Sequence, residues 1–219
     1  MHMPAPASLV TPAHFTPGGL DLLVQLAAAR PIAPACDHFY FLRHGQTGCN
    51  ARRIFQSADE PLSELGLAQA AEATTLLAGE TIHTIVCSDM NRAHVTAQTV
   101  AAPHRLVPAA DAALRERHFG ALIGTSSAAI DWACEPEGGE TLAQFVDRKR
   151  PALAAALARP APVLVVAHGG TLFVLAALLG VPIDMGVLGN AQPLRFERSE
   201  SRWTVTPLQA RGDAAAGIA

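Results

Sequence analysis

The sequence has little of several features that would assign a protein to a functional class. Its 219 residues carry 16 basic and 19 acidic side chains, and the formal net charge of −3 gives no argument for a nucleic-acid or membrane-surface partner. No apolar run reaches the ~20 residues that cross a bilayer. The four cysteines show no Cys-x-x-Cys spacing, which excludes a zinc site or a disulfide framework of the usual kind.

Metal ligands and lysines are also scarce. Asp and His residues do not cluster with metal-ligand spacing, so the sequence predicts no metal site and no cofactor. Lys149 is the only lysine among the 16 basic residues. Half of the residues are hydrophobic, which is enough for one large α/β core. We therefore predict a partly irregular N-terminal extension over residues 1–35 and a single catalytic domain over residues 36–219.

The apolar run Leu20–Ala29 superficially resembles an export signal. However, no Lys or Arg precedes it, and Asp21 lies within it, whereas signal peptides begin with a positively charged segment. The sequence therefore predicts a cytoplasmic protein.

One stretch changes abruptly from apolar residues to basic residues and glycine. Residues 38–42 read as a buried strand, and Arg43, His44 and Gly45 follow directly. Glycine permits a sharp turn, and α/β proteins commonly build their sites at the carboxyl ends of strands. A second apolar strand, 163–167, leads in the same way into His168 and two glycines.

The pattern of apolar runs, caps and prolines predicts alternating strands and helices. We expect a polar loop over 50–61 and a site-covering loop over 121–139. The helix that begins at Leu142 should be kinked or split at Pro151. The predicted helices cover 20–30, 63–79, 89–101, 142–157 and 171–179, and the predicted strands cover 38–42, 82–87, 105–108, 163–167, 194–196 and 203–206. Such alternation is typical of a three-layer α/β/α sandwich with a mostly parallel central sheet.

Four motifs in this order resemble those of the histidine phosphatase superfamily, the phosphoglycerate mutase-like proteins. The resemblance covers roughly residues 38–206. It rests on an Arg-His-Gly-x-Thr-x-x-Asn opening, a Ser-x-x-x-Arg-Ala-x-x-Thr-Ala element, a Glu between cations, and a His-Gly-Gly turn. The matching positions are Arg43, His44, Gly45, Thr47 and Asn50; Ser88, Arg92, Ala93, Thr96 and Ala97; Glu116; and His168, Gly169 and Gly170. The resemblance implies the same sandwich fold.

The resemblance also implies roles for single residues. It assigns the phosphohistidine nucleophile to His44, the general acid to Glu116, and the binding of phosphoryl oxygens to His168. Arg43 and Arg92 are suited to a phosphate dianion because guanidinium groups offer fixed bidentate donors. Nearby arginines should also lower the pKa of the imidazole that attacks. The predicted substrate-binding residues are Gln46, Thr47, Asn50, Arg53 and Gly169, with Arg52 left as an alternative to Arg53.

These residues predict a metal-independent phosphomonoesterase that acts on a small phosphorylated metabolite. A phosphoglycerate mutase is the alternative, and a non-catalytic phospho-ligand binding protein is a third. Hydrolysis is favoured by a short loop over 121–139 that has no Lys or Arg and carries Asp131, Glu135 and Glu137. Arg117, a candidate second-phosphate cation, argues for the mutase. The sequence leaves the substrate and the oligomeric state open.

Overall fold

The computed structural model describes residues 18–200 and 202–210, and its centre is a six-stranded sheet with the order β3-β2-β4-β1-β5-β6. The strands β1, β4, β2 and β3 pair in parallel. The strand β5 pairs antiparallel with β1 and with β6, which forms one edge. The strands are β1 His38–Arg43, β2 Thr84–Ser88, β3 Ala109–Asp111, β4 Val163–Ala167, β5 Pro193–Ser199 and β6 Arg202–Pro207.

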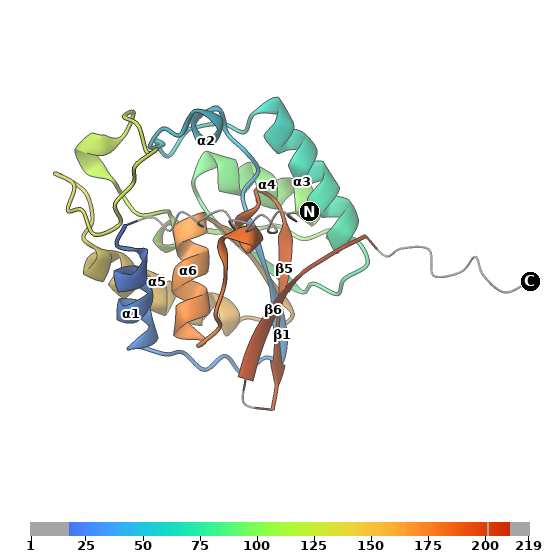
Figure 1. Cartoon of the computed structure of the whole chain (residues 1–219). Coiled ribbons are helices and arrows are strands. Elements are labelled where there is room, and N and C mark those ends of the chain that lie inside the picture. The colour runs from blue at the N-terminus through green and yellow to red at the C-terminus, as the bar shows by residue number, and fades with distance from the viewer. Residues whose placement is uncertain (1–17, 201, 211–219) are drawn as a thin grey trace, which may run out of the picture.

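Helices cover both faces of this sheet, which confirms the predicted three-layer sandwich (Figure 1). On one face lie α1 Leu20–Ala28, α5 Leu142–Leu157 and α6 Gly169–Leu178; on the other lie α3 Glu64–Leu77 and α4 Asn91–Ala101. A short helix α2 Gly48–Arg52 follows β1. The 3₁₀ helices are η1 Ala102–His104, η2 Ala112–Leu114, η3 Gly120–Leu122 and η4 Met185–Leu188.

Local chemistry explains where the main elements begin and which are buried. The strand β4 is buried at every position, as a central parallel strand covered on both faces should be. The helix α6 is buried from Gly170 to Leu178. The Ser63 hydroxyl accepts from the Gly66 N–H at the start of α3, and Thr141 forms a capping box with Gln144 at the start of α5. These caps satisfy backbone donors that the first turn leaves unpaired.

Three local predictions were wrong. The third strand lies at 109–111, and not at 105–108, because Arg105 adopts a left-handed φ of 55° that ends η1. The predicted loop at 50–61 instead begins inside α2, which Thr47 starts with a capping box. Of the kink or split predicted at Pro151, the split is absent, because α5 is continuous through residue 157. The helix stays intact there because Leu153 and Leu157 beyond the proline are buried in the core.

The described part of the N-terminal extension packs onto the sandwich. Leu20, Leu23 and Ala27 of α1 are buried against α5 and α6, and the Ile32 N–H donates to the Leu178 carbonyl at 3.1 Å. The domain boundary predicted at residue 36 stays a prediction. Among the described helices, none is both long and apolar enough to cross a membrane.

Gly45 is required for close packing, and not for the predicted sharp turn. It does not have a left-handed φ. A Cβ at Gly45 would lie 2.4 Å from the Gly66 carbonyl oxygen, and a Cβ at Gly66 would lie 2.0 Å from the Gln46 carbonyl oxygen. Two glycines therefore let the first turn of α3 rest on the segment that follows β1.

Replacing Gly66 should destabilise the protein despite the better helix propensity of alanine. For Gly66→Ala we expect a loss of about 1–3 kcal/mol, since the added methyl group meets backbone that cannot move aside. Gly48→Ala is the control, because a Cβ there makes only ordinary contacts of 3.6 Å and 3.8 Å. Urea unfolding measures both variants. An unchanged midpoint for Gly66→Ala would contradict the packing explanation.

Candidate active site

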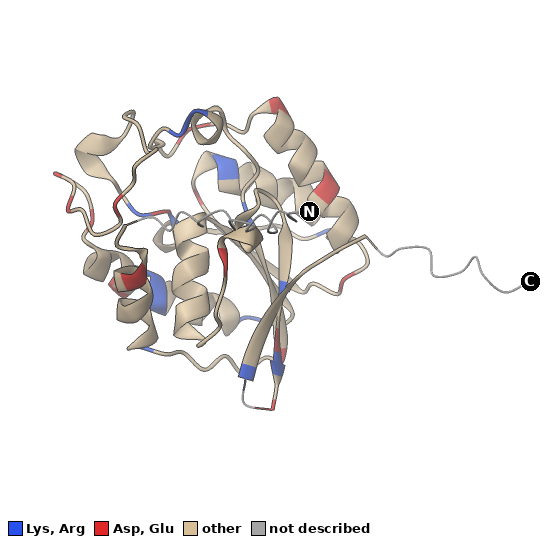
Figure 2. Ribbon diagram, in the orientation of Figure 1, with Lys and Arg blue, Asp and Glu red and all other residues tan. Residues whose placement is uncertain are grey.

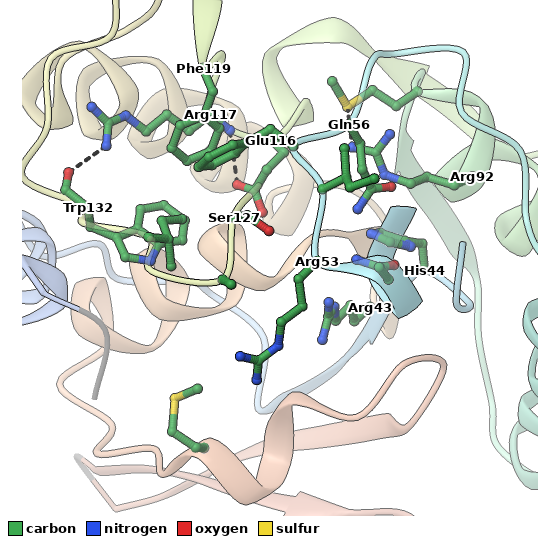
Figure 3. A pocket seen from close by; sticks show the side chains of 17 residues that line it. Arg43, His44, Arg53, Gln56, Arg92, Glu116, Arg117, Phe119, Ser127 and Trp132 are labelled. Atoms are coloured by element: carbon green, nitrogen blue, oxygen red, sulfur yellow. Dashed lines mark hydrogen bonds between the residues drawn. The ribbon is translucent and has the colours of Figure 1, made fainter. Parts of the chain in front are cut away.

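A cavity of about 400 Å³ opens where β1, β2 and β4 end (Figure 3). Basic residues lie in α2 and at the start of α4, close to this end of the sheet (Figure 2). The cavity takes lining residues from six separate parts of the chain. They are Arg43, His44, Asn50, Arg53, Ile54, Phe55, Gln56, Met90, Arg92, Glu116, Arg117, Phe119, Ser127, Ala128, Ile130, Trp132 and Met185.

His44 lies at the end of β1 with one ring nitrogen fixed. Its Nδ1 is 2.7 Å from the Gly45 carbonyl oxygen. Because a carbonyl only accepts, Nδ1 carries the proton of the neutral ring, and Nε2 keeps its lone pair. Burial, Arg92 and Arg43 hold the pKa of His44 well below its usual value. The structure therefore keeps this imidazole neutral and nucleophilic near pH 7.

His168 lies beside His44, although it is not among the residues that line the cavity. The two ring centroids are 5.1 Å apart, and His168 is fully buried. Neither of its ring nitrogens has a hydrogen-bond partner among the described residues. Burial and the neighbouring Arg92 keep its pKa well below the usual value. A buried polar group without a partner is rare, and an oxygen-rich ligand could supply the missing contact.

Arg43 and Arg92 are each anchored by the protein and each keep an unpaired donor. Arg43 Nη1 donates to the Leu188 carbonyl at 2.6 Å. Arg92 Nη1 donates to the Ser57 carbonyl at 2.8 Å, and its Nη2 donates to Met90 Sδ at 3.2 Å. The buried Nε groups of both arginines lack a partner among the described residues. Burial lowers the pKa of both guanidinium groups, and Glu116 opposes this effect. These donors are preorganised for an anion.

Glu116 contributes a carboxylate that the backbone holds in place. Its Oε1 accepts from the Arg117 N–H at 3.0 Å, and its Oε2 accepts from the Gly170 N–H at 2.9 Å. A Cβ at Gly170 would lie 2.5 Å from Glu116 Oε1 and 2.6 Å from Trp132 Cη2. Glycine at this position therefore lets the carboxylate and the indole ring approach the start of α6.

The predicted substrate-binding residues divide into two groups. Asn50 and Arg53 line the cavity, whereas Gln46, Thr47 and Gly169 do not. Thr47 instead caps α2 and donates to Gln56 Oε1 at 2.9 Å. Substrate contacts by these residues stay predictions.

The structure distinguishes the two adjacent arginines at the end of α2. Arg53 lines the cavity, whereas Arg52 does not and donates to the Gly48 carbonyl. Both residues are exposed. The left-handed φ of 52° at Arg53 ends α2 and turns the chain there. This geometry supports the choice of Arg53.

The predicted site residues left out Gln56 and Asn190. Gln56 lines the cavity. The available signal was the segment from Arg52 to Ser57, which resembles, with a small shift, the arginine and Gln-Gly pair of many relatives. Asn190 donates from its amide to the His44 carbonyl at 3.0 Å. It lies 146 positions further along the chain, outside the four motifs, and only the fold brings it near.

Arg117 and the acidic loop do not play the parts that were expected of them. The Arg117 guanidinium donates to the carbonyls of Trp132, Cys134 and Glu140, so it is committed to the protein itself. Although Arg117 touches the cavity, these bonds remove it as a second-phosphate cation. The carboxylates of the loop over 121–139 are also absent from the cavity lining, so they do not contact a ligand there.

Comparisons with known proteins agree with this geometry. A model of the histidine phosphatase superfamily, branch 1, matches residues 39–210. The chain belongs to the histidine phosphatase superfamily. The glucosyl-3-phosphoglycerate phosphatase of Mycobacterium tuberculosis (strain ATCC 25618 / H37Rv) is 36% identical over 181 residues, which cover 68% of this chain and 80% of that protein.

Other relatives extend the comparison. A probable phosphoglycerate mutase of Yersinia pestis is 32% identical over 205 residues, which cover 80% of this chain and 93% of the relative. The structure of the mycobacterial glucosyl-3-phosphoglycerate phosphatase with VO3 has a TM-score of 0.65 and 32% identity. The aligned residues cover 78% of this chain and 97% of the chain in that structure. The superfamily member described here is a phosphatase, and mutase activity has less support.

The two buried histidines should make the stability of the phosphatase depend on pH. Their folded pKa values lie well below the usual 6.5, so below pH 6.5 the unfolded chain binds protons that the folded protein does not. The stability that the two neutral histidines contribute is fully present above pH 6.5 and decreases as the pH falls below that value. Each histidine contributes up to about 1.4 kcal/mol per pH unit.

The variant His168→Asn tests this dependence. It should flatten the slope of the unfolding free energy between pH 4.5 and pH 6 by up to about 1.4 kcal/mol per pH unit. Urea titrations at several pH values measure the slope in both proteins, and contributions from carboxylates cancel in the difference. Identical slopes would contradict a neutral, buried His168.

Proposed function

We propose that the protein hydrolyses phosphate monoesters of a small metabolite through a phosphohistidine on His44, without a metal or cofactor. The observation that supports this most is the convergence of the lone pair on His44 Nε2, inferred from the contact of Nδ1, with the unpaired donors of two buried arginines and the Glu116 carboxylate. A phosphoryl group at this point would meet a nucleophile, cationic donors and a proton donor together. We also predict a cytoplasmic location.

The reaction takes place in two steps. His44 Nε2 attacks phosphorus, the bond to the alcohol oxygen breaks, and protonated Glu116 gives its proton to the leaving oxygen. Glu116, now a carboxylate, takes a proton from a water molecule that attacks the phosphohistidine. The N–P bond then breaks and inorganic phosphate is released. Arg43, Arg92 and His168 bind the equatorial oxygens, where charge redistributes in the transition state.

Asn50, Arg53, Gln46, Thr47 and Gly169 complete the proposed phosphate site. Asn50 and Arg53 would contact the ligand directly, since both line the cavity. Gln46, Thr47 and Gly169 are proposed to bind the ligand as well, although they do not line the cavity. Thr47 caps α2, and Gly169 is the first residue of α6. The relatives named glucosyl-3-phosphoglycerate phosphatase make that ester one natural compound to assay.

A mutase must bind a second phosphate and exclude water while its ligand reorients. Arg117, the cation that sequence reasoning offered for this purpose, is bonded to loop carbonyls. Of the lining arginines, that leaves Arg53 near the mouth, beside the pair that the first phosphate would use. Hydrolysis is therefore the function that this set of cations supports better.

Removing the nucleophile should abolish turnover. For His44→Ala we expect kcat/KM for p-nitrophenyl phosphate to fall by at least about 10³-fold, because no other group replaces the attacking nitrogen. Rapid quench of the wild type should trap protein-bound phosphate that is labile to acid and stable to base. The exposed His83→Ala is the control and should keep wild-type turnover. Label on serine, cysteine or a carboxylate would refute the assignment.

The loss of activity in Glu116→Gln should depend on the leaving group of the ester. Nitrophenolate leaves without needing a proton, whereas an alkoxide needs one, so kcat/KM of the variant should fall about 10²–10⁴-fold on an alkyl phosphate. The fall of kcat/KM on p-nitrophenyl phosphate should be below tenfold. The constant kcat is not the test, because it also includes the later step in which Glu116 is the base. Steady-state kinetics with both esters measure the difference. Equal losses on the two esters would show that Glu116 is not the proton donor.

A further inference from the structure

The side of the cavity that would face the leaving group is apolar. The phosphoryl group must lie against His44 and the arginines, and the leaving oxygen must reach Glu116. The rest of the alcohol therefore extends past Glu116 toward Phe119 and Trp132, on the side opposite Arg43 and His44 (Figure 3). Phe119 and Trp132 are packed edge to face, with ring centroids 5.8 Å apart. Ile130 and Met185 also line the cavity.

Few polar groups remain there to bind hydroxyl groups. The Arg117 guanidinium is occupied by carbonyls of the loop. Gln56 Oε1 already accepts from Thr47, which leaves the amide N–H groups of Gln56 for a ligand. From the loop over 121–139, the polar groups in the described lining are the Ser127 hydroxyl and the indole N–H of Trp132. An alcohol with many hydroxyl groups would lose water here without gaining equivalent hydrogen bonds, which is unfavourable.

We propose that Phe119, Ile130, Trp132 and Met185 form an apolar leaving-group subsite, which selects phosphate monoesters of apolar, ring-bearing alcohols over those of polyhydroxylated alcohols. This proposal rests on the proposed function, because it assumes that Glu116 faces the leaving oxygen. It concerns only the alcohol, and the phosphate contacts are unchanged by it.

The N-terminal segment holds this subsite in place. The Gly18 carbonyl accepts from the Trp132 N–H at 2.6 Å. Gly19 has a φ of +71°, and a Cβ there would lie 2.2 Å from the Ala133 nitrogen. The helix α1 that follows is anchored on α6 and α5. These residues precede the family match, which begins at residue 39, so this chain adds a support for the loop from outside that match.

Arg117 holds the same loop from the other side. Its bonds to the carbonyls of Trp132 and Cys134 come from the residue that follows Glu116, while the Trp132 ring contacts Gly170 next to the carboxylate. The proton donor and the apolar subsite are thus fixed to each other. The subsite is formed before substrate arrives, which favours selection by shape and polarity.

A matched pair of esters tests the proposal. Cyclohexylmethyl phosphate and glucose 6-phosphate are both primary alkyl phosphates on a six-membered ring, and they differ mainly in hydroxyl groups and the ring oxygen. We expect kcat/KM for cyclohexylmethyl phosphate to be at least about tenfold higher, because several buried CH₂ groups contribute. Equal values, or a preference for glucose 6-phosphate, would overturn the proposal.

Near-isosteric variants locate the preference. Ile130→Thr and Met185→Gln should each lower the ratio of the two kcat/KM values about threefold or more, since each places a polar group in the subsite. Trp132→Ala would also remove packing from the loop, so these two variants are the sharper test. Val107→Thr is the control, because Val107 is 91% exposed and does not line the cavity. An unchanged ratio in both test variants would contradict the proposed subsite.

The N-terminal support has its own matched pair of variants. Gly19 and Gly180 both have positive φ values, of +71° and +67°, but a Cβ at Gly180 would meet nothing within 4 Å. Gly19→Ala should raise KM for cyclohexylmethyl phosphate severalfold and leave the inhibition constant of vanadate within about twofold. Gly180→Ala should change neither. A parallel rise of both constants in Gly19→Ala would show that the segment supports the whole site.

Failure of this proposal is distinguishable from failure of the proposed function. Hydrolysis of p-nitrophenyl phosphate that does not depend on His44 would refute the proposed mechanism. An enzyme that depends on His44 but shows no preference for cyclohexylmethyl phosphate would refute only the subsite.

Discussion

The parallel pairing of β1 with β4 is the constraint on which the rest of the site depends. Arg43 is in register with Ala167, and the His44 N–H donates to the Ala167 carbonyl at 3.0 Å. The next residue on each strand is therefore a histidine at the same edge of the sheet. A shift of one residue would turn every side chain of β1 to the opposite face. The buried apolar residues of both strands prevent such a shift and so fix the distance between the two rings.

The site also concentrates positive charge on buried side chains. Arg43, Arg92 and two neutral imidazoles surround one point, with Glu116 as the acidic residue of the lining. Partners are missing for several of their buried nitrogens in the described chain. This arrangement costs stability, because buried polar groups without partners are unfavourable. A phosphate dianion would supply the missing acceptors, which explains how function can retain such an unfavourable cluster.

The loop over 121–139 determines what else can enter. Its acidic residues suggested repulsion of a second phosphate, but they do not line the cavity, and the loop presents Ile130 and Trp132 instead. Arg117, next to the catalytic candidate Glu116, holds this loop through its carbonyls. The Arg117 guanidinium therefore stabilises the loop and is not available to bind a ligand. Hydrolysis is still preferred over mutase activity. The reason is now that Arg117 is bonded to loop carbonyls, and not that the loop is acidic.

The sequence alone determined the sandwich and most element boundaries, because apolar periodicity and caps are local properties of the chain. Through their resemblance to the histidine phosphatase superfamily, its short motifs also predicted the residues of the site, including Glu116 and His168. The tertiary structure decided what depends on packing between distant segments. It shows that Gly45 serves close approach to α3, that Arg53 and not Arg52 lines the cavity, and that Gly18 and Gly19 lie against the loop at residues 132–133. At such positions the direction of a side chain depends on the element that packs against it. That element comes from a distant part of the chain, so the local sequence does not reveal it.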